Sequence, residues 1–415
     1  MKDIRVTSTI SSQQQYKINS SIIFNYLRDK GSISRKQISN NLGISAPVVS
    51  KVIEGLINEG LVIEKGKVKT QSGKRPIILE VKGDDKFVIG IDLGKEKLRM
   101  SLTDFSGAMV ERYIGFEMAK DIENLDKKII NEVKKFLSKT KFKKPVKMKD
   151  IKSICIGFPA SINPINGMII DGTLYRNWGN LNLKEVLEKK FNIPIYIEND
   201  VNLSAMAEKR FGKGKRFKNI IFMEISNGIG IGIILEDYIY RGSKGSAGEI
   251  AYKIVGRENL GFRLKNKGFF EKYASMEGLK NIFINAIKDG MKSSVKDRVS
   301  GNLKNIEPYM IIDAVNQGDE LSKNILEEVL DLLSISLIDL ILTLDPEIIV
   351  LGGDILNLSK KEDFLLRPII KNLKNIIPFE IPPIEFSSMG EDACIIGASD
   401  FAINSQIISR FPFKI

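Results

Sequence analysis

The feature that most constrains this chain is a series of short apolar blocks at helical spacing between Lys17 and Val81. In three blocks, apolar residues recur every three or four positions, and the last block runs from Val48 to Ile57. The blocks are separated by residues that commonly cap or begin helices: Ser34, Gly43, Ser45 and Pro47. The spacing predicts three short helices, with a tight turn between the second and the third.

A predicted hairpin follows the third helix. The apolar run Leu61–Ile63 leads into GKVKTQSGKRP, which is rich in glycine, lysine and arginine, and then into IILEV. Apolar runs joined by such a segment are typical of a β-hairpin with a basic tip. Three helices and this hairpin predict a winged helix-turn-helix domain over residues 1–82.

The charge of this segment predicts a partner. Residues 1–80 hold 13 Lys and Arg against 6 Asp and Glu, a net charge of +7 (13 − 6) out of +12 for the whole chain. A basic winged helix binds duplex DNA through its phosphates and reads bases from the start of its recognition helix. The alternative is a solvated basic domain or a winged helix that docks onto protein. The expected DNA contacts are Ser34, Arg35, Ser45, Ala46, Pro47, Val49, Ser50, Lys51, Lys65, Lys67, Lys74 and Arg75.

The composition narrows the remaining choices. A length of 415 residues is too great for one hydrophobic core and predicts two or three domains. No run of about 18 apolar residues could span a membrane, and the first residues lack the apolar core of a signal peptide, so we expect a cytoplasmic protein. Cys155 and Cys394 lie in apolar surroundings, which favours buried thiols over a disulfide. Histidine is absent, so any acid–base chemistry would fall on a carboxylate.

From Lys86 onward, strand-like runs alternate with helical blocks, as in FVIGIDLG, LRMSLTDFSG and IKSICIGFPA. A second set starts near Asn219, passes through a helix-rich region and reaches the buried run EIIVLGGDI. This order predicts two α/β lobes facing one cleft, with a first lobe over 83–200, completed by a helix over 390–415, and a second lobe over 201–389. The segment TKFKKPVKMKD is interpreted as a solvated loop, with a second nucleic-acid patch as the alternative.

Glycines after several predicted strands would let the backbone approach a phosphate or a sugar: Asp92–Gly94, Gly228–Gly232 and Gly352–Gly353. With the segments IENDVNLSAMAE, GSAGEI and NKGFFEKYAS, they resemble the ROK family of repressors, open reading frames and kinases. The resemblance covers nearly the whole chain and implies the actin-like (ribonuclease H-like), two-lobed α/β fold of sugar kinases. With a winged helix in front, the layout is similar to the family's transcriptional regulators of the NagC/XylR type.

The resemblance also implies a sugar site. Asn199 and Asp200 match the family's sugar-contacting amide and the carboxylate that is the catalytic base in its kinases, and a carboxylate can accept a sugar hydroxyl proton. For Asp200 the alternative is a helix N-cap. Glu249 and Glu271 match further sugar-binding carboxylates, which taken singly would be interpreted as surface residues. The turn bordering the sugar would be formed by Gly157, Pro159 and Ala160.

One departure from the family concerns zinc. Members commonly bind structural zinc through a histidine and three cysteines, the ligands that tetrahedral zinc prefers. The matching positions here hold Tyr252, Phe262, Leu264 and Phe269. We therefore expect no metal and no cofactor, with an apolar plug in place of zinc and the Tyr252 hydroxyl directed at the sugar.

A second departure concerns phosphate. Family kinases carry DxGGTxx after the first strand, whereas residues 92–96 read DLGKE. A glycine and a threonine are lost, and Glu96 would repel a phosphate at about 4 Å by several kcal/mol, partly offset by Lys95. The remaining nucleotide-site matches are degenerate, because their glycines would also serve tight turns: Asp92, Gly94, Gly228, Gly230, Gly352 and Gly353.

The predicted function is therefore a sugar-responsive transcriptional regulator, a repressor of carbohydrate genes, with xylose among the candidate effectors. We expect a homodimer or tetramer on a two-fold operator and no enzyme activity. The first alternative is an ATP-dependent sugar kinase with Asp200 as general base. The second is a constitutive DNA-binding protein with a vestigial cleft.

Overall fold

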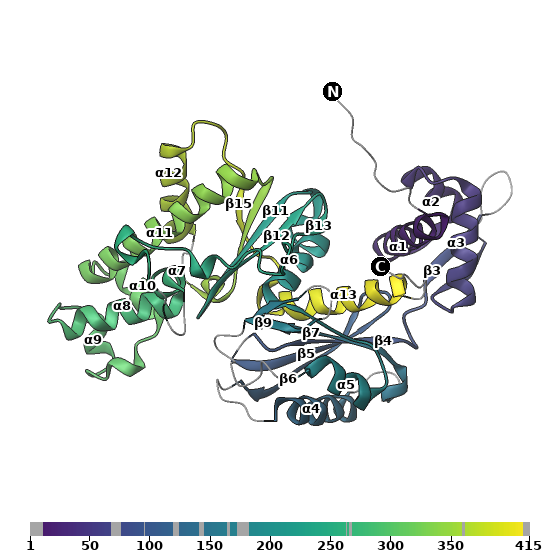
Figure 1. The fold of residues 1–415 in the computed structure, drawn as a ribbon, viewed down its shortest axis with the longest axis horizontal. Coiled ribbons are helices and arrows are strands. Elements are labelled where there is room, and N and C mark those ends of the chain that lie inside the picture. Colours follow the sequence, from purple (N-terminus) through teal and green to yellow (C-terminus); the bar gives the residue numbers. More distant parts are fainter. Residues whose placement is uncertain are drawn as a thin grey trace.

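The computed structural model describes residues 11–67, 76–94, 96–118, 124–140, 145–163, 167–171, 182–262, 264, 268–358 and 362–409. They form an amino-terminal winged helix and two lobes, with the long helix α13 (Ala393–Ser409) lying between the winged helix and the second lobe (Figure 1). Within the described ranges, no helix combines the length and apolar character needed to cross a membrane.

The amino-terminal part is a winged helix-turn-helix, as predicted. The Ser34 hydroxyl accepts a hydrogen bond from the Gln37 backbone N–H and so caps the second helix, and Gly43 ends that helix at a φ of 67°. Its strands pair antiparallel in the order β1-β3-β2. The elements are α1 (Ser12–Lys30), β1 (Ile33–Ser34), α2 (Arg35–Leu42), α3 (Ala46–Asn58), β2 (Val62–Lys67) and β3 (Ile77–Val81).

The described strands also form two five-stranded sheets, one in each lobe. The first has the order β10-β7-β4-β5-β6: β4 (Phe87–Asp92), β5 (Lys97–Asp104), β6 (Met109–Glu117), β7 (Ile151–Phe158) and β10 (Ile195–Asn199). The second has the order β13-β12-β11-β14-β15: β11 (Ile220–Ile225), β12 (Ile229–Leu235), β13 (Tyr238–Ile239), β14 (Ile348–Gly352) and β15 (Ile384–Phe386).

The two sheets share one topology. In each, the first strand pairs antiparallel with the second and parallel with the fourth, and the fourth pairs parallel with the fifth. This repeat is the actin-like, ribonuclease H-like arrangement, so the predicted fold class is confirmed. β6 was missing from the predicted strands because it is an edge strand without a fully buried residue, so it has no continuous apolar run.

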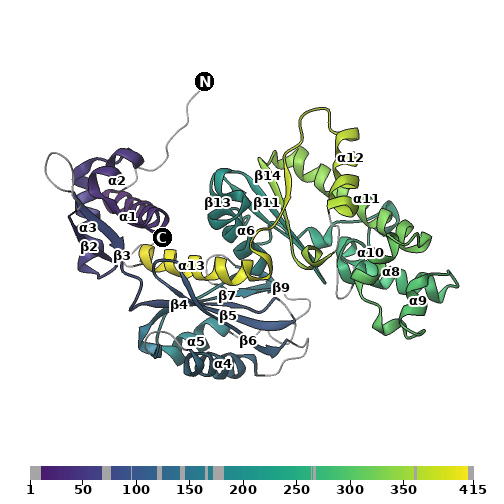
Figure 2. The ribbon, with the colours of Figure 1, turned by 180° about the vertical axis from the view of Figure 1, so that it is seen from behind.

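A crossing pair of helices connects the lobes. α6 (Asp200–Phe211) follows the last strand of the first sheet but packs on β11 and β12 of the second sheet. α13 follows the last strand of the second sheet but packs on β4 and β7 of the first. The two helices pack against each other between the sheets (Figure 2). Each sheet is therefore covered by a helix that the other lobe supplies.

The remaining elements complete the two lobes. On the face opposite α13, the first sheet is covered by α4 (Leu125–Lys139) and α5 (Leu183–Phe191), while β8 (Ser161–Ile162) pairs with β9 (Ile169–Asp171). Helices gather at the far side of the second lobe: α7 (Phe269–Ala274), α8 (Met276–Lys288), α9 (Ser294–Arg298), α10 (Pro308–Val315), α11 (Glu320–Leu344) and α12 (Arg367–Ile376). Both cysteines are free and buried, as expected from their apolar surroundings.

The crossing of α6 and α13 predicts the effect of a single methyl group. A Cβ added at Gly397 would lie 1.9 Å from the backbone oxygen of Leu203, so Gly397→Ala must push the helices apart. Overpacking of this kind typically costs about 1–3 kcal/mol, so we expect a lower thermal unfolding midpoint, measured by circular dichroism. Gly228→Ala is the matched control, because its methyl would meet nothing closer than 3.9 Å. Equal midpoints for the two variants would contradict the crossing.

Candidate functional site

The carboxyl ends of three parallel strands lie side by side in the first lobe. Asp92 at the end of β4 is level with Gly157 in β7, and Phe158 at the end of β7 is level with Asn199 at the end of β10. Ligands of open α/β sheets bind at such ends. The register therefore gathers the matches to the phosphate loop, the GFPA turn and the IEND motif at one edge.

Asn199 and Asp200 stand at the junction of β10 and α6. The Asn199 side chain caps α6 by accepting from the Asn202 backbone N–H at 2.9 Å, and its amide donates to the Ala160 carbonyl at 3.2 Å. Asp200 is thus the first residue of α6, and the N-cap is Asn199. The alternative that Asp200 itself caps the helix is therefore wrong. A Cβ at Gly94 would lie 1.9 Å from Asp200 Oδ2, so the phosphate-loop match and the predicted sugar carboxylate are in direct contact.

A hydrogen bond joins the two lobes across this edge. The Ser161 hydroxyl, in β8 of the first lobe, donates to Glu249 Oε1 of the second lobe at 2.7 Å. Glu249, a predicted sugar ligand, therefore lies beside the turn formed by Pro159 and Ala160. Ser161 was missed by the sequence interpretation, since a lone serine after a turn carries no distinctive pattern.

An ion pair between the lobes contacts the IEND motif. Arg241, which follows β13 in the second lobe, donates through Nε and Nη2 to Glu198 Oε2, each at 2.7 Å. The other oxygen of Glu198 accepts from the Asn199 backbone N–H at 3.0 Å and from the Asn202 side chain at 3.1 Å. The pair thus holds the start of α6 against the second lobe. Arg241 was also missed, because its partner lies 43 positions away in sequence.

The other predicted sugar residues lie in the second lobe. Glu271 is in α7, and a Cβ at Gly228 would lie 3.9 Å from its carboxyl carbon, so α7 borders the turn between β11 and β12. Tyr252 ends a short 3-10 helix (Ile250–Tyr252) that starts directly after Glu249. These placements put Glu249 and Tyr252 in neighbouring positions; the role of each toward a sugar stays a prediction.

The expected apolar plug at the family's zinc position is wrong. Phe269 is buried, but Phe262 is 70% exposed and Tyr252 is 41% exposed, while Leu264 is half-buried. The loop is held instead by short turns and by the ion pair of Lys253 with Asp339 on α11. Among the described residues, no group of three or more acidic, cysteine or histidine side chains is arranged to hold a metal.

The phosphate side of the cleft is strongly acidic. Burial raises the pKa of the Cys394 thiol well above its usual value, and the charges of Asp92, Asp200 and Glu224 raise it further. The negative charges of these three carboxylates therefore act on the buried Cys394 thiol. Nearby, Arg99 of the first lobe pairs with Glu391 at 2.8 Å beside a hollow of about 20 Å³, which has room for about one water molecule.

Apart from Gly228, the glycines matched to the nucleotide site have structural roles here. A Cβ at Gly352 would lie 2.4 Å from the Phe222 ring, and one at Gly230 would lie 3.3 Å from Val201. Gly353 has a φ of 90°, a backbone conformation that favours glycine. The Asp92 carboxylate accepts from the Gly94 backbone N–H at 2.8 Å. Tight packing and turn geometry therefore account for these residues without a nucleotide.

The winged helix presents the start of α3 to solvent. The exposed residues at and near the start of α3 are Ser45, Ala46, Pro47 and Lys51, and Ser50 is half-buried. Glu54 and Lys36 are also exposed, and the sequence interpretation missed both. Glu54 lies four positions after Ser50 and three after Lys51, so helical spacing could have found it.

Two predicted DNA contacts are corrected by burial. Val49 is fully buried among the packed residues of the winged helix, because the face of α3 that it occupies closes the core. Ser34 is 5% exposed, and its hydroxyl is used in the cap of α2. Arg35 and Lys65 are paired with Glu64 and Glu80. Outside the described residues lie Lys74, Arg75 and the side chain of Lys67.

Comparison with known proteins agrees with this geometry. A model of the ROK family matches residues 88–405. This chain belongs to the ROK family. A second family model, described as a winged helix-turn-helix DNA-binding domain, matches residues 21–63. The chain is therefore a ROK protein with an amino-terminal winged helix, which confirms the predicted family and the predicted winged helix-turn-helix.

Individual relatives have the same length and organisation. The chain is 29% identical to the xylose repressor of Caldicellulosiruptor bescii, over 95% of this chain and 97% of the relative. It is 27% identical to the DNA-binding transcriptional dual regulator NagC of Escherichia coli, over 86% and 85% of the two chains. A solved ROK family transcriptional regulator, a homolog of the E. coli MLC protein, superposes with a TM-score of 0.78 at 21% identity over 95% and 96%.

The pair behind the IEND motif predicts a stability effect. Arg241→Met would leave Glu198, whose side chain is 6% exposed, without its cationic partner. Removing one partner of a buried pair costs about 3–5 kcal/mol, and because the Arg241 side chain is 25% exposed we expect about 1–3 kcal/mol. Thermal unfolding measures this loss. Lys189→Met, which breaks an exposed pair with Glu185, should cost less than about 0.5 kcal/mol and is the control.

Proposed function

We propose that this chain is a sugar-responsive DNA-binding transcriptional regulator that represses genes of carbohydrate use. The observation that carries the proposal is the direct attachment of a winged helix, with the start of α3 exposed, to a two-lobed fold whose sugar side keeps Asn199, Asp200, Glu249 and Glu271. The printed names of the relatives support it, because one is a xylose repressor and another a DNA-binding transcriptional regulator.

The proposed effector is a free sugar bound between the lobes. Carboxylates and an amide at fixed positions accept from and donate to vicinal sugar hydroxyls. Asp200 and Asn199 would contact the sugar from the first lobe, and Glu249, Tyr252 and Glu271 from the second. D-xylose is the first sugar to test, given the name of the Caldicellulosiruptor relative. Because the sugar would bind one arrangement of the lobes more tightly, it would shift the lobes toward that arrangement.

The proposed DNA site is a two-fold operator bound by a homodimer or tetramer. A winged helix covers only one half-site, and a symmetric pair gives the two half-sites their fixed spacing. Ser45, Ala46, Pro47, Ser50 and Lys51 would contact the major groove, with Glu54 as a further base contact, because a carboxylate can accept from cytosine.

We propose that the chain has no sugar kinase activity. Glu96 stands where family kinases carry threonine, and its negative charge would repel a bound phosphate. The repressor names of the relatives favour the same conclusion.

The DNA contact and the sugar response can be measured together. We expect the purified chain to retain promoter fragments of its own genome and saturating D-xylose to weaken retention about tenfold, a coupling within the usual ~1–3 kcal/mol. Lys51→Ala should weaken binding to every fragment and lower the slope of log affinity against log salt by about one. Lys288→Ala, an exposed lysine on α8, is the charge-matched control. If no fragment is retained in a salt-sensitive manner, the proposed function is wrong.

Asp200→Asn separates the switch from the kinase. The variant keeps the shape of the side chain but cannot act as a base, and losing a charged hydrogen bond to sugar should weaken D-xylose binding by about tenfold or more. We expect no ADP release above background from wild type or variant with magnesium-ATP and D-xylose, D-glucose or N-acetylglucosamine. Turnover of the wild type at about one per second or faster, abolished in Asp200→Asn, would instead establish a kinase.

A further inference from the structure

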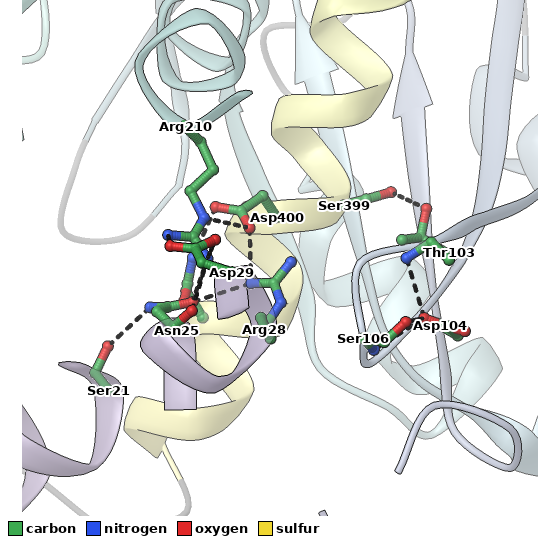
Figure 3. Close-up of polar contacts among 12 residues, drawn as sticks. Ser21, Asn25, Arg28, Asp29, Thr103, Asp104, Ser106, Arg210, Ser399 and Asp400 are labelled. Carbon is green, nitrogen blue, oxygen red and sulfur yellow. Dashed lines mark hydrogen bonds and ion pairs between the residues drawn. The ribbon is translucent and has the colours of Figure 1, made fainter. Parts of the chain in front are cut away.

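A cluster of charged side chains joins the winged helix to both crossing helices (Figure 3). Arg28 and Asp29 come from α1, Arg210 from the last turn of α6, and Asp400 from α13. Arg28 Nη1 lies 2.8 Å from Asp400 Oδ1, and the two side chains are 2% and 6% exposed. Arg210 Nη2 lies 2.9 Å from Asp29 Oδ1, and its Nε lies 3.8 Å from Asp400 Oδ1. We call these four residues the joint cluster.

Amide side chains close the cluster into a ring. Arg28 Nη1 donates to Asn25 Oδ1 at 3.0 Å, and Arg210 Nη2 donates to the Asn25 carbonyl at 3.2 Å. The Asn25 amide donates to Asn404 Oδ1 at 2.8 Å, and the Asn404 amide donates to Asp400 Oδ2 at 2.8 Å. Three helices from three parts of the molecule therefore share one polar network.

α1 contacts both α6 and α13, so its contacts depend on how the two lobes are placed. α13 packs on the sheet of the first lobe and α6 packs on the sheet of the second lobe. A rotation of one lobe against the other must therefore displace α6 along α13. Because α1 is bound to Asp400 on one helix and to Arg210 on the other, it cannot keep both contacts when they separate.

α6 also connects the predicted sugar site to the joint cluster. The helix begins at Asp200, a predicted sugar contact, and Arg210 lies ten positions later, roughly 15 Å along the helix axis. Ser204 and Leu203 pack inside the crossing, so this helix moves as one body. A displacement at the sugar end of α6 is thus delivered to the contact with the winged helix.

The chemistry of the joint cluster suits a switch better than a rigid connection. Arg28 Nε, Arg210 Nε and Asp400 Oδ1 are buried, and none has an aligned hydrogen bond among the described residues, although Asp400 lies within ion-pair distance of both guanidinium groups. Apolar side chains of similar size would stabilise such an interface as well or better. When Arg210, whose side chain is 20% exposed, leaves Asp400, the carboxylate keeps its ion pair with the buried Arg28.

Apolar contacts beside the cluster also pack α1 against α13. Ile23, Phe24 and Leu27 of α1 belong to one continuous core with Ala398 and Ala402 of α13. On the other side, a Cβ at Gly107, in the turn between β5 and β6, would lie 2.7 Å from Arg28 Nη2, so Arg28 is enclosed by the first lobe. The first lobe and α13 thus hold α1, and Arg210 is the contact that comes from the second lobe.

We propose that the joint cluster is the regulatory connection between the cleft and the winged helix, with Arg210 as its moving member. Closure of the cleft displaces α6 along α13, Arg210 leaves Asp29 and Asp400, and the winged helix takes a new orientation. This proposal rests on the proposed function, because it explains how a bound sugar changes DNA affinity.

Arg210→Met is the test, since it removes the charge and keeps an unbranched apolar stem. Lys209→Met is the matched control on the same helix. The Lys209 ammonium pairs with Asp237 and donates to the Phe217 carbonyl, both of which lie outside the winged helix. Promoter-fragment affinity is measured with and without saturating D-xylose, with N-acetylglucosamine in a parallel arm. D-xylose affinity is measured separately by calorimetry on the full chain.

We expect D-xylose to change promoter affinity about tenfold in the wild type and in Lys209→Met, and by less than about twofold in Arg210→Met. D-xylose affinity should stay within about threefold in all three. Spin labels at Glu54→Cys on α3 and Lys288→Cys on α8 give a readout without DNA, since both positions are exposed. Their separation should respond to D-xylose in the wild type and not in Arg210→Met.

The outcomes distinguish the two proposals. If neither sugar changes promoter affinity in the wild type, the proposed sugar response fails and the joint cluster fails with it. If the wild type responds and Arg210→Met responds equally in affinity and label separation, the joint cluster is overturned and the proposed function stands. Should Arg210→Met fail to fold, Asp29→Asn removes the partly exposed partner of Arg210 and must reduce the sugar response in the same assays.

Discussion

The close crossing of α6 and α13 is the contact on which the rest of the structure depends. Gly397 allows the two helices to approach until their backbones meet, and each helix covers the sheet of the opposite lobe. Relative movement of the lobes therefore becomes relative movement of two packed helices. Because packed interfaces shift between discrete arrangements rather than deform continuously, such a crossing is well suited to report whether a ligand lies between the lobes.

The two sides of the cleft have diverged in chemistry. On the sugar side, Asn199 is fixed by its cap on α6, and Glu198 with Arg241 supports it from the second lobe. On the phosphate side, Glu96 stands where family kinases carry threonine. Under the proposed function, a cleft that binds sugar without phosphorylating it would close the lobes and then release the ligand unchanged, which is what a reversible sensor requires.

Much of this could be predicted from the sequence, and the failures have one physical origin. Capping residues and apolar periodicity located α1 to α3, since these signals act within a few residues of each other. Val49 was assigned to DNA because its position at the start of α3 suggested it, but the face it occupies is decided by packing against the other helices. The exposed Phe262 likewise contradicts a plug that only its apolar character suggested.

The sequence by itself determined the winged helix, because its caps and apolar spacing act within contiguous segments. The order of strands and helices, together with the resemblance to the ROK family, also determined the two-lobed fold. Only the tertiary structure decided which distant residues meet. Arg28, Arg210 and Asp400 have no pattern in common and lie far apart along the chain, yet the crossing helices bring them within ion-pair distance. Such contacts depend on the packing of whole elements, which no local segment specifies.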